Sequence, residues 1–420
     1  MFDARDTHPV RRLKTFFRAI IVGVVAIVVP TQLTDLLPSG CAHAQMMFGG
    51  GMGDAAQTIT KRSLDGYAKI LNLNEDQHTA AKSLLEAYQA STRSATEKFD
   101  KEMKVLQEDF ADTQDFREFQ KQIAGKAKTF TAIATKLEEN FFEDLKAVLD
   151  DTQAEEWPRV ERFHRRETLL RFGMVSGAGV DLLAALARVK IEPQSSPELA
   201  EAVARYETDI DQLLVVMERD QKAQQDGMLS GEGAFDPTQI QTMMKAMYES
   251  AAKVRDLNRE THRKFLAAVP ADRAEAYAHE FNRRSFPRVY RTTHTTKLLK
   301  AAAGFADVTE DQKSEIARLT EDYNRALAPA NDKWAKAVEE QEDAAGGTMM
   351  VMMQGFSGQG GGNSEVTDAR KVRKELDNSS KERLLAVLTD EQEARLPEPD
   401  EPKDNGFGGF FSVADEDDEE

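Results

Sequence analysis

The sequence repeats itself at long range, and this repetition limits the folds open to it more than any other feature. The stretch Leu145–Pro158 aligns without a gap with Leu384–Pro397, and a weaker copy, Phe265–Ala278, lies between them. Self-similarity at a long period indicates repeated supersecondary units that pack against one another. We therefore expect three diverged copies of one unit, at 62–175, 180–292 and 293–398.

Apolar residues within a unit recur at steps of three and four, which is the spacing of an amphipathic helix. The clearest stripe contains Phe116, Phe119, Ile123, Ala127, Phe130, Ile133, Leu137, Phe141, Leu145 and Val148. The short segment 109–115 separates it from a similar upstream stripe, so the two helices should form an antiparallel hairpin. We predict an all-α fold of three tandem helical-hairpin units with long antiparallel amphipathic helices.

Five-residue motifs mark the expected helix starts. Leu388–Gln392 reads Leu-Thr-Asp-Glu-Gln, and close variants stand at 73–77, 149–153 and 308–312. The second residue of each motif can cap a helix N-terminus, and the glutamine three residues later can reach back to the backbone amide of the cap. The predicted helix-capping residues are Asn74, Gln77, Asp150, Gln153, Thr309, Gln312, Thr389 and Gln392.

These motifs resemble those of the LTxxQ-motif periplasmic proteins (Spy- and CpxP-like). The resemblance extends over the three units and implies a small all-helical cradle, often dimeric. It also implies ATP-independent chaperoning of unfolded proteins, or envelope-stress and metal-stress signalling. The chain departs from that family in joining three units, in its acidic character, and in having no His-rich segment.

The first 44 residues have the pattern of an export signal. Basic residues precede the apolar run 19–29, and Ala42–Ala44 offers a small-x-small cleavage site. We expect a signal peptide at 1–44, a Gly/Met-rich linker at 45–61, and a periplasmic or secreted protein without stable membrane insertion after signal removal. Lipid anchoring at Cys41, the only cysteine, and an uncleaved N-terminal membrane anchor are the alternatives.

The chain is strongly acidic, with a formal charge of −18. The expected signal carries five basic and three acidic residues, so its removal leaves 50 basic and 70 acidic side chains and a charge of −20. Such a surface repels nucleic acid, which we exclude as a partner. From Glu398 onwards ten acidic residues accompany one lysine, and we predict a disordered acidic tail at 399–420.

Two segments at the unit junctions interleave arginines with aromatic rings, a combination that can hold an extended peptide. The alternative is that the arginines neutralise acidic neighbours while the rings pack between helices. The predicted client-binding residues are Trp157, Arg159, Arg162, Phe163, Arg165 and Arg166 in the first segment, and Arg283, Arg284, Phe286, Arg288, Tyr290 and Arg291 in the second.

Methionines gather in three groups: Met46, Met47 and Met52; Met243, Met244 and Met247; and Met349, Met350, Met352 and Met353. The last group lies in a Gly/Met-rich loop at 344–364, which we expect to be flexible. Thioethers suit Cu(I), but they also serve as adaptable apolar packing groups. We predict no cofactor and no metal site, with methionine-based copper binding kept as an alternative.

The sequence shows no nucleophile elbow, phosphate-binding loop or His-x-x-x-His pair, so no catalytic residue is predicted and the chain is not expected to be an enzyme. The favoured function is an exported helical binding protein with chaperone-like or envelope-stress action, whose partners are unfolded or peptide-like protein clients. A structural or scaffolding protein without client binding is the alternative, and homo-oligomer formation is left open.

Overall fold

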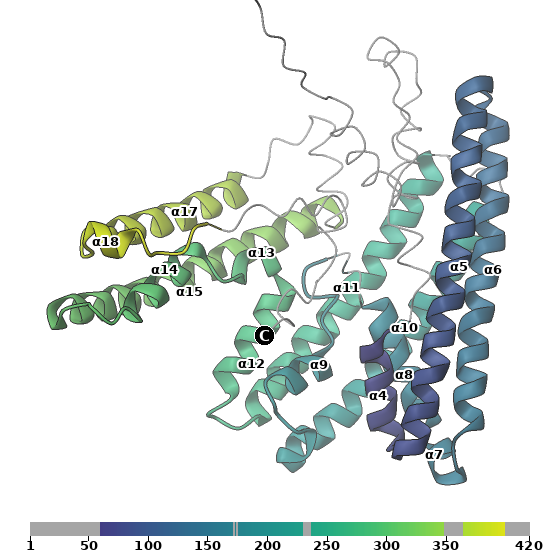
Figure 1. The fold of residues 1–420 in the computed structure, drawn as a ribbon, viewed down its shortest axis with the longest axis horizontal. Helices are drawn as coiled ribbons and strands as arrows, with labels where there is room; N and C mark the ends of the chain where they lie inside the picture. Colours follow the sequence, from purple (N-terminus) through teal and green to yellow (C-terminus); the bar gives the residue numbers. More distant parts are fainter. Residues whose placement is uncertain (1–58, 171–172, 174, 230–236, 348–363, 400–420) are drawn as a thin grey trace, which may run out of the picture. The chain divides into compact units, whose positions relative to one another are not determined.

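The structure is a computed structural model that describes residues 59–170, 173, 175–229, 237–347 and 364–399. All regular elements in this part of the chain are helical, which confirms the all-α prediction (Figure 1). The expected signal peptide, nearly all of the linker, most of the Gly/Met-rich loop and all but the first residue of the tail lie outside the described residues.

The described residues divide into two compact units, with 59–169, 211–229 and 237–246 in the first and the remainder in the second. The first unit contains α4 (Lys61–Leu71), α5 (Glu75–Thr113), α6 (Phe116–Ala147), α7 (Asp151–Glu155) and α8 (Trp157–Leu169). The second contains α9 (Leu182–Arg188), η1 (Pro193–Ser195), α12 (Ala274–Ser285), α13 (Pro287–Tyr290), α14 (His294–Ala303), α15 (Glu310–Ala345), α17 (Ser364–Leu385) and α18 (Asp390–Glu393). Helices α10 (Pro197–Leu229) and α11 (Pro237–Ala268) contribute to both units. The assignment of three repeats remains a prediction.

The long helices α5 and α6 of the first unit pack against each other as a hairpin (Figure 1). Two pairs of stacked rings continue this contact towards the turn. The ring centroids are 4.7 Å apart for Phe99 and Phe130 and 4.6 Å apart for Phe110 and Phe119. The predicted connection 109–115 is too long, because α5 continues to Thr113. Only Gln114, in the left-handed region at φ 54°, and Asp115 form the turn.

The core of the first unit lies at the other end of this hairpin, where α4 and α8 also pack. Its buried side chains include Tyr67, Leu71, Leu85, Tyr88, Phe141 and Leu145. Complete burial of an apolar side chain of this size stabilises a fold by about 1.5–3 kcal/mol, so these residues outweigh the thinner contacts near the turn.

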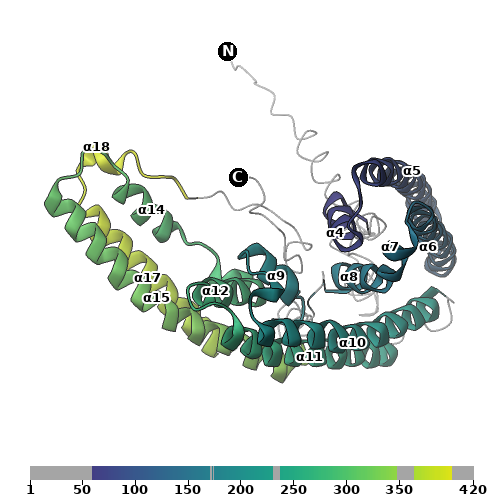
Figure 2. The same cartoon turned by 90° about the horizontal axis from the view of Figure 1, so that it is seen from below.

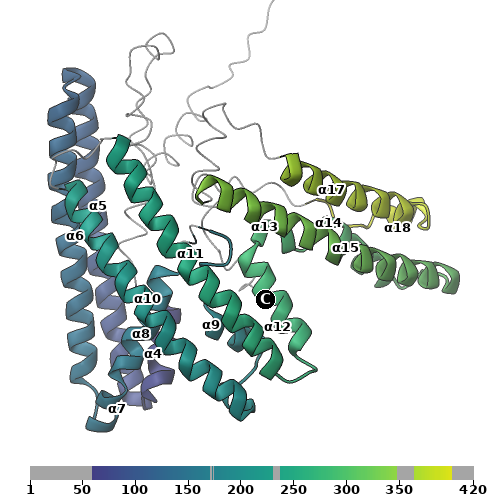
Figure 3. The same cartoon turned by 180° about the vertical axis from the view of Figure 1, so that it is seen from behind.

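In the second unit, Ser196 donates a hydrogen bond to the Ala268 carbonyl at 3.1 Å, and Tyr206 donates to Asn258 at 2.9 Å. These paired positions run in opposite directions along α10 and α11, so the two helices are antiparallel here (Figure 3). Asn258 is completely buried, and its amide donates to the carbonyls of Gly177 and Val180 at 2.9 Å each. One amide thus ties both helices to the loop before α9.

Helices α15 and α17 of the second unit form another antiparallel pair (Figure 3), and α14 flanks them (Figure 2). Their shared core includes Leu298, Leu299, Ile316, Leu319, Tyr323 and Leu384. Near the end of α15, the buried Glu342 carboxylate accepts hydrogen bonds from the Ser176 amide and hydroxyl, both at 2.9 Å. Glu339 and Asp343 pair with Arg259 and Arg255 of α11, which joins α15 to the rest of the unit.

Candidate functional site

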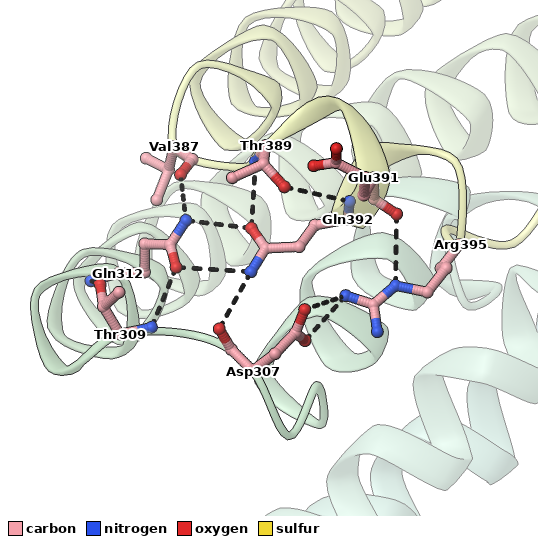
Figure 4. Close-up of polar contacts among 8 residues, drawn as sticks. All are labelled: Asp307, Thr309, Gln312, Val387, Thr389, Glu391, Gln392 and Arg395. Carbon is pink, nitrogen blue, oxygen red and sulfur yellow. Dashed lines mark hydrogen bonds and ion pairs between the residues drawn. The ribbon is translucent and has the colours of Figure 1, made fainter.

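The cap motifs of the second unit meet in a closed network of amide hydrogen bonds (Figure 4). Thr309 and Thr389 each cap a helix, and Gln312 and Gln392 each accept the cap's own backbone N–H at 3.0 Å. The Gln312 Nε2 donates to Gln392 Oε1 at 3.0 Å and to the Val387 carbonyl at 2.8 Å. We call such a pair of glutamines an amide clasp.

The second glutamine completes this clasp in the opposite direction. The Gln392 Nε2 donates to Gln312 Oε1 at 3.5 Å and to the Asp307 carbonyl at 3.4 Å. Arg395 donates two bonds of 2.7 Å to the Asp307 carboxylate, which lowers the pKa of that carboxyl, and lies over the Phe305 ring at 4.5 Å. The clasp therefore connects the start of α15 to the start of α18.

The first unit contains the same clasp between Gln77 and Gln153. Both have capping-box partners, Asn74 for Gln77 and Asp150 for Gln153, and their Nε2 groups donate to one another's Oε1 at 2.7 and 2.9 Å. They also donate to the carbonyls of Val148 and Asn72 at 2.9 and 3.3 Å. In all four cases the carbonyl belongs to the residue two positions before the partner's cap.

The expected middle repeat, 180–292, lacks both glutamines and therefore cannot form a clasp. Leu199 stands three residues after the cap Ser196, and Pro270 and Arg273 occupy the aligned positions of the second motif. Ser196 still accepts the Leu199 N–H at 3.1 Å, whereas α12 begins without a side-chain cap. A proline side chain cannot accept a hydrogen bond, and leucine offers no amide.

The first arginine–aromatic segment, residues 157–166, is mostly engaged within its own unit. Trp157 is buried, its indole N–H donates to Glu161 at 2.7 Å, and Lys146 lies 4.3 Å above the ring. The Phe163 ring packs edge-on against Tyr67, whose hydroxyl lies 2.7 Å from His164 Nδ1. The sequence marks Phe163 for client binding, but it offers no signal for this contact with a residue 96 positions earlier.

The arginines of this segment differ in exposure and partners. Arg159 is exposed and pairs with Glu156 at 2.9 Å. Arg165 pairs with Asp211 and, at 3.0 Å, with Glu218. Arg166 is buried and Arg162 is half-buried. The ion pairs of Arg159 and Arg165 match the alternative in which these arginines neutralise acidic neighbours.

Arg283 and Arg284 of the second segment converge on one buried carboxylate, that of Glu280. Arg283 approaches Glu280 at 3.1 Å, Arg284 at 2.5 Å, and Arg188 of α9 lies 3.8 Å away. Burial raises the pKa of the Glu280 carboxyl, but hydrogen bonding and attraction from Arg284 and Arg283 outweigh it, so the pKa lies below its ordinary value. Sequence reasoning missed Glu280 because a glutamate on a charged helix carries no distinguishing signal.

The end of the second segment presents a different arrangement, which we call the α13 surface. It consists of the half-buried rings of Phe286 and Tyr290, the exposed Arg288 and Arg291, and Arg370 of α17. Tyr290 donates to Asp332 of α15 at 2.6 Å, which fixes its ring. Partial desolvation by neighbouring groups, followed by repulsion from Arg370 and Arg291, lowers the pKa of the Arg288 guanidinium.

Two of these arginines have no counter-charge in the part of the chain that the structure describes. Neither Arg291 nor Arg370 forms an ion pair or hydrogen bond to another described residue. These two guanidinium groups lie close enough to Arg288 for their repulsion to lower its pKa, although acidic residues outnumber basic ones in the chain by 73 to 55. Arg159, Arg165, Arg283 and Arg284 are thus paired with carboxylates, whereas Arg291 and Arg370 form no ion pair with another described residue.

The two outer methionine groups, at 46–52 and 349–353, lie outside the described residues. Met244 of α11 is buried, and Met243 and Met247 are half-buried. Within the described ranges, no three His, Cys, Asp or Glu side chains are grouped so that they could hold a metal ion. None of the helices described is both long enough and apolar enough to span a bilayer.

Comparison of the chain with protein-family models, curated proteins and solved structures finds no significant match. The resemblance to the LTxxQ-motif proteins therefore depends on the motifs themselves.

Proposed function

We propose that this chain is an exported, non-enzymatic binding protein that holds unfolded or peptide-like segments in the manner of an ATP-independent chaperone. In this proposal it is built from three diverged helical-hairpin units. The duplicated amide clasp supports the repeat, because two clasps of the same bonding pattern occur 235 residues apart, at Gln77 and Gln312.

The observation that carries the binding proposal is the α13 surface. Guanidinium groups with unused donors bind carboxylates and peptide carbonyls, and neighbouring rings add apolar contact area. Arg291 and Arg370 have such donors available, and Phe286 and Tyr290 lie beside them with their ring centroids 6.4 Å apart. The preferred clients are therefore extended segments that carry both acidic and aromatic residues.

The same reasoning assigns the second segment a larger part in binding than the first. Trp157 is already buried, and Arg165 already holds two carboxylates. Recruiting these groups to a client would break existing contacts, whereas Arg291 and Arg370 can gain contacts without giving up an ion pair to another described residue. Charge-assisted hydrogen bonds to such donors contribute roughly 1.5–3 kcal/mol each.

An aggregation assay tests the proposal. The chain is added to a chemically unfolded model protein on dilution from denaturant, and light scattering is followed. The unchanged chain should suppress scattering, and Arg288→Gln/Arg291→Gln should require about tenfold more protein for equal suppression, the equivalent of roughly 1.4 kcal/mol.

Lys82→Gln/Arg93→Gln is the matched control, because both side chains are exposed, belong to the first unit and are free of ion pairs among the described residues. It should behave as the unchanged chain. Equal suppression by the α13 variant and the control would contradict the assignment of the surface. No suppression by the unchanged chain would favour the scaffolding alternative, which the internal pairing of the first segment supports.

A further inference from the structure

The acidic C-terminal segment leaves the described structure close to the α13 surface. Leu396 packs against the core of α14, α15 and α17, and the next carbonyl, of Pro397, lies 3.0 Å from His294 Nε2. His294 begins α14, only three residues after Arg291. The described end of the chain runs beside α14 (Figure 2), so the remaining residues start from a fixed point near the surface.

The segment that follows has the composition that this surface favours. Residues 398–420 contain ten acidic side chains against Lys403, together with Phe407, Phe410 and Phe411. With the disorder that its composition predicts, a chain of this length has a root-mean-square span on the order of 25 Å, which would bring the surface within its reach. Attachment at Pro397 also gives the segment an effective concentration of roughly millimolar, at which weak contacts become occupied.

We propose that the acidic tail, residues 398–420, binds the α13 surface of its own chain, with its carboxylates on Arg288, Arg291 and Arg370 and its phenylalanines beside Phe286 and Tyr290. The tail would then act as an internal competitor that clients must displace. This regulatory consequence rests on the proposed function, whereas binding of the tail itself does not. Because the attraction is largely ionic and exposed, it weakens as salt screens the charges.

Energy transfer within the full chain measures this binding. Trp157→Phe leaves Trp334 as the only tryptophan donor. Trp334 is close to the α13 surface in the chain, because it stands two residues after Asp332, which accepts a hydrogen bond of 2.6 Å from Tyr290. Cys41→Ser/Ser412→Cys provides one thiol, in the tail, for an acceptor dye. We expect transfer at low salt that falls as salt rises to about 1 M, where the Debye length is about 3 Å.

Charge reversals then locate the contact. Arg291→Glu/Arg370→Glu should reduce transfer at low salt to its high-salt value, and adding Asp417→Arg/Asp418→Arg should restore it. Lys82→Glu/Arg93→Glu, with the same change in net charge, should leave it unaltered. Far-UV circular dichroism confirms that each variant is folded. The proposal is overturned if energy transfer changes neither with salt nor with Arg291→Glu/Arg370→Glu. It is also overturned if Lys82→Glu/Arg93→Glu reduces energy transfer as much as Arg291→Glu/Arg370→Glu does.

The two proposals fail separately. If transfer follows these expectations but the chain does not suppress aggregation, the tail binds and the client function is wrong. If aggregation is suppressed and depends on Arg288 and Arg291 while transfer is insensitive to Arg291→Glu/Arg370→Glu, the surface binds clients and the tail does not occupy it. If both hold, deleting 400–420 should lower the amount of protein needed for suppression.

Discussion

At the scale of single residues, the glutamines of the clasps use their full hydrogen-bonding capacity. Each Oε1 accepts from the cap's backbone N–H and from the partner amide, and each Nε2 donates to the partner and to a carbonyl. A side-chain amide has two donor hydrogens and two acceptor positions, so none remains unused. The glutamine therefore caps its own helix and joins it to a second one.

Removing one glutamine should consequently lower the free energy of unfolding by more than the loss of a helix cap alone. Gln392→Ala leaves the Thr389 N–H, the Asp307 carbonyl and the Gln312 amide short of partners in a site where Gln392 is 3% exposed. We expect a loss of about 1–3 kcal/mol in the free energy of unfolding, measured by urea titration. Gln122→Ala, at an exposed position, should change it by less than about 0.5 kcal/mol.

The pairing itself can be separated from the caps by a double variant. Gln312→Ala/Gln392→Ala should lower the free energy of unfolding by less than the sum of the two single substitutions. The reason is that the second substitution removes a group that the first has already left unpaired. Additive costs would mean that the two amides act independently and that the clasp is only a pair of caps.

At the scale of elements, close approach between helices depends on small or flat groups. A Cβ atom on Gly66 of α4 would lie 2.3 Å from the Phe163 ring of α8, so only glycine allows these helices their present separation. In the second unit His262 of α11 stacks on Phe281 of α12 at 3.8 Å, with 9° between the ring planes. Burial at this contact favours the neutral form of the imidazole ring.

The packing of α11 on α12 should therefore depend on pH. Burial, with a smaller contribution from Arg263, lowers the pKa of His262 from 6.5 to about 4. The unfolded chain thus binds this proton at a higher pH than the folded one, so the stability contribution is complete above pH 6.5 and is lost as the pH falls towards 4. His262→Phe, which keeps the stacking, should lose less stability than the unchanged chain between pH 6.5 and 5.

Urea midpoints at several pH values between 7 and 5 measure this difference. The remaining histidines and carboxyl groups are common to both proteins, so their effects cancel in the comparison. Parallel curves for the two proteins would show that His262 takes up its proton equally in the folded and unfolded chains.

At the scale of the whole molecule, each compact unit has its own core and its own tryptophan. Trp157 lies in the first unit and Trp334 in the second. The two clasps are divided in the same way, with Gln77 and Gln153 in the first unit and Gln312 and Gln392 in the second. Units with separate cores can unfold in separate steps, although α10 and α11 contribute to both.

Single-tryptophan chains test this division. Gly66→Ala should lower the thermal midpoint reported by Trp157 through a packing conflict of about 1–3 kcal/mol, and change that of Trp334 little. Gln392→Ala should lower the thermal midpoint reported by Trp334 and change that of Trp157 little. Trp334→Phe and Trp157→Phe supply the two reporters, and fluorescence during heating supplies the midpoints. If each substitution moves both midpoints equally, the units unfold as one cooperative body.

The sequence by itself determined the helical class and the positions where capped helices begin. Those signals are local: apolar residues three or four positions apart share a face, and Thr389 caps an amide three residues away. It also indicated that Gln114 and Asp115 lie near a turn, but it placed the end of α5 too early. The left-handed backbone of Gln114, which ends the helix, has no distinct sequence signature.

Only the tertiary structure decided which distant residues meet. Gln77 bonds to Gln153 across 76 positions, and Arg370 joins Arg288 and Arg291 across about 80. It also decided that Trp157 is buried while Arg291 is exposed, although both belong to similar arginine–aromatic segments. Such outcomes depend on how helices pack in space, because burial and pairing are properties of the neighbours that the fold brings together, not of the residues along the chain.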